Sequence, residues 1–340
     1  MRVLVPLLLS VWAFGSTVSA DWVLEDAAWF SELTATFPLL SPRGLTAWTW
    51  QWTETVTEAR VLSLVLHCVV SGLAAVLAYL LGLSVMGAWV AGVLLLLHPL
   101  AVESVTYAAS RSELVSALGV VSGCLLAVLL RQWWRWPLIG LCVLVAVLGK
   151  ESGIVLLALV PLMLYATGQP WLMSAGVAYL IAVIGAMGYY RGGLDILAHR
   201  GDYAQDIQVL DWMQMQSVAV WHMVYVTITT TGMTPDVDYD RIPMAGRLLS
   251  LLSLGIVALV AGVASIAWRS PAGIGVLFML MAVSPRFVVQ TPTSYLNEHQ
   301  FYTPRIGLFM ACAAALVFVG ERAQQCVIIT RRGHYGPEIT

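Results

Sequence analysis

Apolar segments recur along most of the chain and restrict its fold more than any other feature of the sequence. Ten can be drawn, at roughly residues 1–20, 61–82, 85–97, 114–130, 136–149, 152–167, 171–190, 248–268, 271–285 and 306–320. Of the 340 residues 59% are hydrophobic and only 11% are charged, and the mean hydropathy is +0.83. Soluble globular domains carry about 25% charged residues. We therefore predict an all-α, polytopic helical membrane protein with one transmembrane domain over residues 1–320.

Several of these runs are shorter than the ~20 residues that cross a bilayer, so we expect their helices to extend into polar flanks or to stop short. Residues 1–20 have the features of a signal peptide, and we expect them to be kept as a first transmembrane helix. Residues 212–231 are only moderately apolar, which favours an interfacial or re-entrant helix within a polar loop at 191–247. The pattern predicts about ten transmembrane helices, or eleven if 212–231 crosses.

Charge orients this arrangement. With ten spans, the side that holds both termini carries seven arginines against two glutamates. Basic residues favour the cytoplasm, so both termini and a tail at 321–340 are predicted to be cytoplasmic. The polar loops 21–60, 98–113, 191–247 and 286–305 would then face outward. Outward means the periplasm or exterior in a bacterium and the lumen of the endoplasmic reticulum in a eukaryote.

Residues 98–113 form a polar island between two apolar runs. If a helix opens at Pro99, a 3.6-residue period places Glu103, Tyr107 and Arg111 on one stripe. Lipid offers no partners to such groups, so protein or water must satisfy them. The stripe is either part of a binding site or a helix cap with a salt bridge at the membrane edge.

Two further polar groups follow apolar runs on the outward side. Glu25 and Asp26 come just after the first helix, where partial shielding would suit a general base. Lys150, the only lysine, could hold a phosphate as a point charge, or it could be a surface lysine paired with Glu151. Near the last run, the polar segment 295–305 supplies a third cation, Arg305, or an interfacial anchor.

No metal site or nucleic-acid arm is predicted. Four of the five cysteines, Cys68, Cys124, Cys142 and Cys312, lie in apolar runs without the spacing of metal ligands. The alternating acids Asp236, Asp238 and Asp240 could attract a divalent cation, but such acids in a polar loop are more often solvated. We expect no cofactor and no nucleic acid partner.

Three motifs in order resemble one family. They are His98-Pro-Leu-Ala-Val-Glu103 through Arg111-Ser-Glu113, Leu148-Gly-Lys150-Glu151, and Asn297-Glu298-His299-Gln-Phe-Tyr302-Thr-Pro304. Together with Gly44-Leu45-Thr46 and His67, they are similar to GT-C integral-membrane glycosyltransferases, in particular the protein O-mannosyltransferase-like group that includes enzymes with tetratricopeptide repeats. No such repeats follow residue 320, so recognition of an acceptor by repeats is not implied.

The resemblance implies a GT-C-like fold and transfer of a sugar from a polyprenyl-phosphate carrier to an extracytoplasmic acceptor. The family's acidic pair falls on Glu25 and Asp26, as general base, although the family usually has Asp first. Its Arg-x-Asp reads Arg111-Ser112-Glu113 here, with a longer acid. Donor phosphate would be bound by Lys150, Arg111 and Arg305. Substrate-binding or supporting roles would fall on His98, Glu103, Tyr107, Glu113, Glu151, Glu298, His299 and Tyr302.

The leading hypothesis, as the resemblance implies, is an inverting glycosyltransferase embedded among membrane lipids, whose acceptor is a protein Ser or Thr or a glycan. The alternative is a transporter or flippase of a lipid-linked or anionic substrate, which predicts polar residues in broken helices at mid-membrane depth. A third hypothesis is a structural subunit that docks through the tryptophan-rich loop 21–60. The sugar, the acceptor and the carrier lipid are not specified by the sequence.

Overall fold

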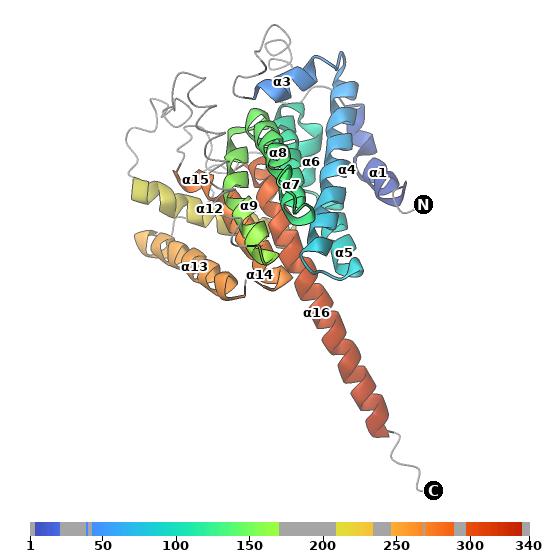
Figure 1. Cartoon of the computed structure of the whole chain (residues 1–340), viewed down its shortest axis with the longest axis vertical. Coiled ribbons are helices and arrows are strands. Elements are labelled where there is room, and N and C mark those ends of the chain that lie inside the picture. The colour runs from blue at the N-terminus through green and yellow to red at the C-terminus, as the bar shows by residue number, and fades with distance from the viewer. Residues whose placement is uncertain are drawn as a thin grey trace.

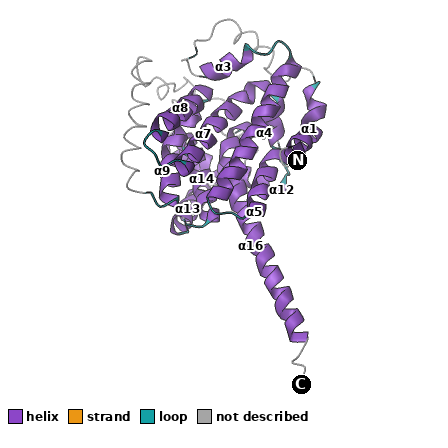
Figure 2. Cartoon of the chain, turned by 45° about the vertical axis from the view of Figure 1, so that its right-hand side comes forward, coloured by secondary structure: helices purple, strands orange, loops and turns teal. Residues whose placement is uncertain are grey.

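The computed structural model describes residues 4–20, 39, 43–169, 209–233, 246–267, 269–288 and 297–334. Throughout these ranges every regular element is helical (Figures 1 and 2). The α-helices are α1 (Leu4–Val18), α3 (Gly44–Trp50), α4 (Val56–Leu80), α5 (Val85–Leu97), α6 (Ala101–Thr106), α7 (Arg111–Leu129), α8 (Arg135–Gly149), α9 (Leu156–Ala166), α12 (Val209–Thr229), α13 (Gly246–Ile266), α14 (Pro271–Val283), α15 (Pro285–Val288) and α16 (Tyr302–His334). Three 3-10 turns join them, η1 (Ala108–Ser110), η2 (Glu151–Val155) and η5 (Glu298–Phe301). The predicted all-helical class is confirmed for this part of the chain.

Several helices begin at side chains that satisfy their first backbone N–H groups. Thr55 caps α4 in a capping box with Glu58, and Ser84 and Ser270 cap α5 and α14. Pro271 follows Ser270 at the start of α14, where a missing N–H is tolerated. The boundaries of these helices are thus written locally in the sequence.

The expectation of about ten full spans is wrong for the described residues. Three helices there are long and apolar enough to cross a membrane, and they cover Val56–Leu80, Ala108–Leu129 and Glu298–Gln324. The runs at 85–97, 136–149 and 271–285 form helices of 13, 15 and 13 residues. At 1.5 Å per residue these helices extend about 20 Å, short of the ~30 Å hydrocarbon core. Counting each apolar run as a transmembrane helix therefore gave too many spans, because some runs form helices too short to cross the hydrocarbon core.

Glycines allow the central helices to pack at backbone contact. A Cβ placed on Gly119 of α7 would lie 2.5 Å from the backbone nitrogen of Ala146 in α8. A Cβ on Gly307 of α16 would lie 2.4 Å from the carbonyl oxygen of Gly275 in α14. Small residues at such crossings let membrane helices approach closely. These two pairs, α7 with α8 and α14 with α16, hold the middle of the bundle (Figure 1).

Polar contacts at the two ends of α8 identify the two ends of the bundle. At one end, Thr46 of α3 donates a 2.9 Å hydrogen bond to the carbonyl of Gly149, where α8 ends. At the other, Arg135 at the start of α8 donates to Gln169, just after α9. We call the first the polar end and the second the far end. From the polar end α16 runs through the bundle and continues beyond it toward the C-terminus (Figures 1 and 2).

Helix α12 contains most of the segment 212–231. It contacts Arg286 of α15 near its start and His98, which follows α5, near its end. Near its start, Trp212 Nε1 donates to the carbonyl of Arg286 at 2.8 Å, and near its end the carbonyl of Thr227 lies 2.8 Å from His98 Nε2. Its buried residues Ala219, Val220 and Met223 pack with those of α14 and α16. The interfacial or re-entrant placement of this helix in a membrane stays a prediction.

Candidate functional site

The polar island does not form the single helix that was predicted from Pro99. Helix α6 ends at Thr106, and Tyr107 adopts an extended backbone (φ −81°, ψ 102°) before η1 and α7. The guanidinium of Arg60 accounts for part of this break, because its Nε donates to the carbonyl of Thr106 at 3.0 Å. As a result Glu103 and Arg111 do not share one helical stripe, and each has its own set of partners.

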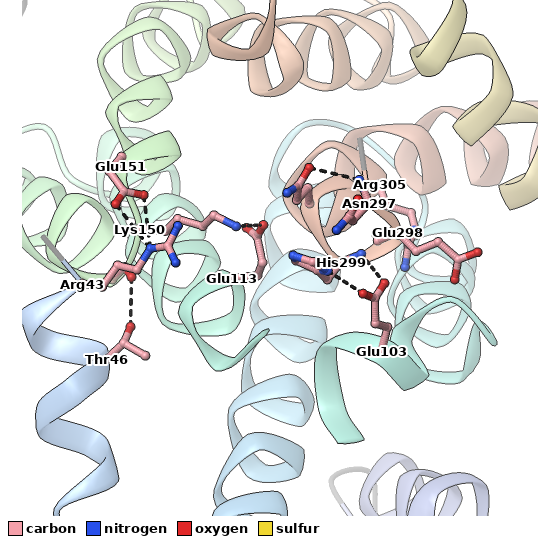
Figure 3. A network of polar contacts seen from close by, with 12 residues as sticks. Arg43, Thr46, Glu103, Glu113, Lys150, Glu151, Asn297, Glu298, His299 and Arg305 are labelled. Carbon is pink, nitrogen blue, oxygen red and sulfur yellow. Dashed lines mark hydrogen bonds and ion pairs between the residues drawn. The ribbon is translucent and has the colours of Figure 1, made fainter. Parts of the chain in front are cut away.

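Glu103 on α6 is bound to His299 in η5. Its Oε2 accepts the backbone N–H of His299 at 2.7 Å, and its Oε1 lies 2.5 Å from His299 Nδ1 (Figure 3). Burial raises the pKa of Glu103 to about 7, against the opposing effect of the backbone N–H bond. The ring of Tyr107 packs edge-on against that of His299, with centroids 6.4 Å apart. Three residues of the predicted site, separated by almost 200 positions, are thus brought together.

Two salt bridges, Lys150 with Glu113 and Arg43 with Glu151, link the ends of α7, α8 and α3. Lys150 Nζ lies 2.5 Å from Glu113 Oε1, and both side chains are buried. Lys150 therefore does not pair with its neighbour Glu151, which is bound 3.3 Å away by Arg43 Nε. Burial lowers the pKa of Lys150, and the carboxylate of Glu113 opposes that shift. The surface-lysine interpretation is excluded by this burial.

These two groups lie in one region at the polar end (Figure 3). His299 is within electrostatic range of Lys150 and Glu113, and Glu103 is within range of the same two residues. Glu113 lies between the Lys150 side and the His299 side of the network (Figure 3). The ends of α6, α7 and α8 and the turn before α16 therefore supply one cluster of ionisable groups.

Arg305, one turn into α16, is the least satisfied cation of this cluster. It is 0% exposed, and its Nη2 donates to the carbonyl of Glu298 at 3.1 Å. Within the described part of the chain its Nε and Nη1 have no hydrogen-bond partner. Glu298 and Glu103 lie within electrostatic range of it. A buried guanidinium with two nitrogens that lack partners in the part of the chain that the structure describes is suited to an anionic ligand.

Arg111 has different surroundings. Its Nη2 donates to the carbonyl of Ala59 at 2.8 Å, and its guanidinium lies 4.5 Å from the centre of the Trp50 ring. Its Nε and Nη1 donate to Ser63 and Thr49. All three of its nitrogens are therefore used, and they tie α7 to α3 and α4. These contacts point to a bracing role instead of direct contact with a donor phosphate.

Two histidines link helices inside the bundle. His98 Nε2 donates to the carbonyl of Thr227 while its Nδ1 accepts the backbone N–H of Leu100, so the ring is the neutral Nε2–H tautomer. Burial lowers the pKa of His98 to about 4, in agreement with this tautomer. His67 lies 2.7 Å from the hydroxyl of Tyr302 and 3.0 Å from the carbonyl of Leu96. Tyr302 and His98 therefore position their helices.

The predicted bases Glu25 and Asp26 lie outside the described residues, as do Asp236, Asp238 and Asp240. The structure does show where the chain enters the first loop. Arg60 Nη1 donates to the carbonyls of Thr17 and Ala20, while its Nε binds Thr106 in the polar island. Ala20 therefore lies beside the end of α6. Among the described residues no cluster of three or more metal-ligating side chains occurs.

Two arginines of the cluster escaped the sequence reasoning. Arg43 binds Glu151, and Arg286 lies within electrostatic range of both Glu113 and Glu151. A signal existed for Arg286, because it follows the apolar run 271–285 just as Lys150 follows the run 136–149. Arg43 gave only a weak signal, since it stands directly before the noted Gly44-Leu45-Thr46.

Comparison with protein-family models, with curated proteins and with solved structures finds no match to this chain.

Proposed function

We propose that the chain is a membrane glycosyltransferase that transfers a sugar from a polyprenyl-phosphate carrier to an acceptor hydroxyl outside the cytoplasm. The observation that carries this proposal is Arg305, a fully buried guanidinium whose Nε and Nη1 are unpartnered among the described residues. A phosphate oxygen accepts such N–H groups with charge assistance. The departing lipid phosphate is the group whose charge must be stabilised in this reaction.

Lys150 would act with Arg305. It is held by Glu113 at 2.5 Å, in a place where His299 and Glu103 are also within electrostatic range. An ammonium has three donors, so Lys150 can keep Glu113 and still donate to a phosphate. Glu113 would fix the lysine, and Glu103 with His299 would hold η5, whose Glu298 binds Arg305.

A general base is proposed at Glu25 or Asp26. Either would take the proton of the acceptor hydroxyl as its oxygen attacks the anomeric carbon, and the bond from that carbon to the phosphate oxygen breaks with inversion. Support comes from the entry of the first loop, since Ala20 is bound through Arg60 next to the end of α6. Glu25 is five positions after Ala20, so the chain between them spans at most about 18 Å.

The orientation is part of the proposal. The polar end would face outward and the far end would face the cytoplasm, together with the C-terminal part of α16. Two arginines in the segment 130–135, Arg131 and Arg135, and one in the segment 267–270, Arg269, support this orientation, because basic residues are expected to be in excess in cytoplasmic loops.

The test uses the full chain in liposomes with undecaprenyl-phosphate mannose and dolichyl-phosphate mannose as trial donors and a Ser/Thr-rich peptide as acceptor. Release of the free lipid phosphate and mass of the peptide are measured. Arg305→Gln is expected to lower the transfer rate about a hundredfold or more, the effect of removing a donor that stabilises developing charge. Glu25→Gln and Asp26→Asn identify the base, since only the base variant should lose transfer.

Arg322→Gln is the matched control, because Arg322 is exposed on α16 far from the cluster and should keep the wild-type rate. Full transfer by folded Arg305→Gln would contradict the phosphate role. If both acid variants keep full transfer, the base assignment is wrong. If the wild type moves the lipid-linked sugar across the vesicle without transferring it, the transporter alternative replaces the enzyme.

A further inference from the structure

Arg135 at the far end is a second buried arginine that the proposed function does not use. It is 0% exposed at the first residue of α8. Its Nη1 donates to the carbonyl of Leu130 at 2.7 Å and to Gln169 Oε1 at 2.9 Å. Its Nε and Nη2 have no hydrogen-bond partner within the described ranges.

Within the described ranges no anionic group compensates the charge of Arg135. No ion pair of the described residues includes Arg135, and the charged residue that acts on it is another cation, Arg131. The Trp136 ring, 4.7 Å from its guanidinium carbon, contributes a cation–π contact but accepts no further N–H bond. Desolvating a guanidinium without a counter-ion is unfavourable, so an external anion would complete this site.

The residues around Arg135 indicate that this anion is a lipid headgroup. The turn before α8 exposes Trp133 and Trp134, at 79% and 41%. Tryptophans favour the headgroup level of a bilayer. The N–H groups of Arg135 and Trp136 already donate to Gln132 and Trp133, so the guanidinium and the positive end of the α8 dipole remain to attract an anion.

We propose that Arg135, assisted by Arg131, binds the headgroup phosphate of an anionic lipid at the end of the bundle opposite the candidate site. Two phosphate oxygens would accept from Nε and Nη2. Arg131, which is exposed and within electrostatic range of Arg135, would add a second positive charge. Basic pockets between membrane helices on the cytoplasmic side are known to take such headgroups. The bound lipid would fasten α8 to α9 through the Gln169 contact.

The experiment is native mass spectrometry of the full chain in detergent with dioleoylphosphatidylglycerol, dioleoylphosphatidylcholine or inorganic phosphate. The wild type is expected to retain one phosphatidylglycerol in preference to phosphatidylcholine. Arg135→Gln should weaken that binding about tenfold or more, as expected for loss of charge-assisted hydrogen bonds. Arg131→Gln should weaken it less, because Arg131 adds charge without a buried contact.

Arg322→Gln controls for general basicity and should bind as the wild type does. Equal retention of phosphatidylglycerol by folded Arg135→Gln would overturn the site. The thermal midpoint of the wild type in each lipid is a second measurement that needs no variant, and equal midpoints in the two lipids would also overturn it. If inorganic phosphate stabilises the protein as well as phosphatidylglycerol does, the assignment to a lipid headgroup is wrong.

Discussion

Replacement of Glu103 by Gln tests whether this buried carboxyl holds a proton in the folded state. A protonated carboxyl can donate from Oε1 to His299 Nδ1 while Oε2 accepts the backbone N–H of the same residue, at the observed 2.5 and 2.7 Å. Gln places an amide NH2 group, which donates, and a carbonyl oxygen, which accepts, in the same positions. The substitution should therefore keep both hydrogen bonds and remove only the titration.

The sign and size of the effect follow from the pKa. The folded pKa of Glu103 is about 7 against an ordinary value of 4.5, because burial disfavours the charge. Between these values the native state binds more protons than the unfolded state, so its contribution to the free energy of unfolding falls as pH rises through this window. At 1.36 kcal/mol per unit, the wild type loses about 3 kcal/mol between pH 4.5 and 8, and Glu103→Gln does not.

The assay is denaturant unfolding of both proteins in mixed micelles at several pH values from 4.5 to 8. Glu103→Gln should match the wild type near pH 5 and be the more stable by about 3 kcal/mol at pH 8. Glu103→Ala, which leaves both groups of His299 without partners, should be less stable than Glu103→Gln by about 2–6 kcal/mol. A Glu103→Gln variant that is strongly destabilised at every pH would refute the argument, because it would show an ionised carboxylate paired with imidazolium.

Three further predictions follow from the packing and the ion pairs. Gly307→Ala places a Cβ against the backbone of α14, so it should lower the free energy of unfolding by about 1–3 kcal/mol in denaturant unfolding. Gly72→Ala is the control, because a Cβ there has no atom within 4 Å, and it should be neutral or stabilising in the same assay. Lys150→Met should lower the free energy of unfolding by about 3–5 kcal/mol, because it leaves Glu113 buried without its salt-bridge partner. Adding Glu113→Gln should recover much of that loss. A double-mutant cycle that shows no coupling between the two positions would contradict the pair. Arg111→Ala should unfold the contact of α7 with α3 and α4, seen as faster proteolysis near residue 50, and unchanged digestion would refute the bracing role.

The candidate site shows which inferences could be made locally. Lys150 and Glu103 were singled out from their polarity beside apolar runs, and Glu113 and His299 from the family resemblance. The structure places all four in one cluster. Their pairing was not predictable in the same way. The adjacent Glu151 is not the partner of Lys150, because neighbouring residues at the end of a helix point in different directions. Glu151 instead binds Arg43, which lies 108 positions away in the sequence.

Helix count and the roles of the arginines also depended on tertiary structure. An apolar run shows that a segment is buried in protein or lipid, but not whether its helix reaches across a bilayer, and so 13-residue helices such as α5 and α14 were counted as spans. Arg111 and Arg305 look alike in sequence, each within a polar stretch before a long apolar run. Only the fold surrounds Arg111 with acceptors and leaves two nitrogens of Arg305 without acceptors among the described residues.

The sequence by itself determined the helical class, the membrane-like composition and the polar segments from which a site could be built, because hydropathy, caps and turn residues act over a few positions. The tertiary structure decided which charges pair and which stay unsatisfied. The physical reason is that a buried ion is stabilised or left unpaired by groups brought to within about 4 Å, and that distance is set by helix packing between residues far apart in the chain.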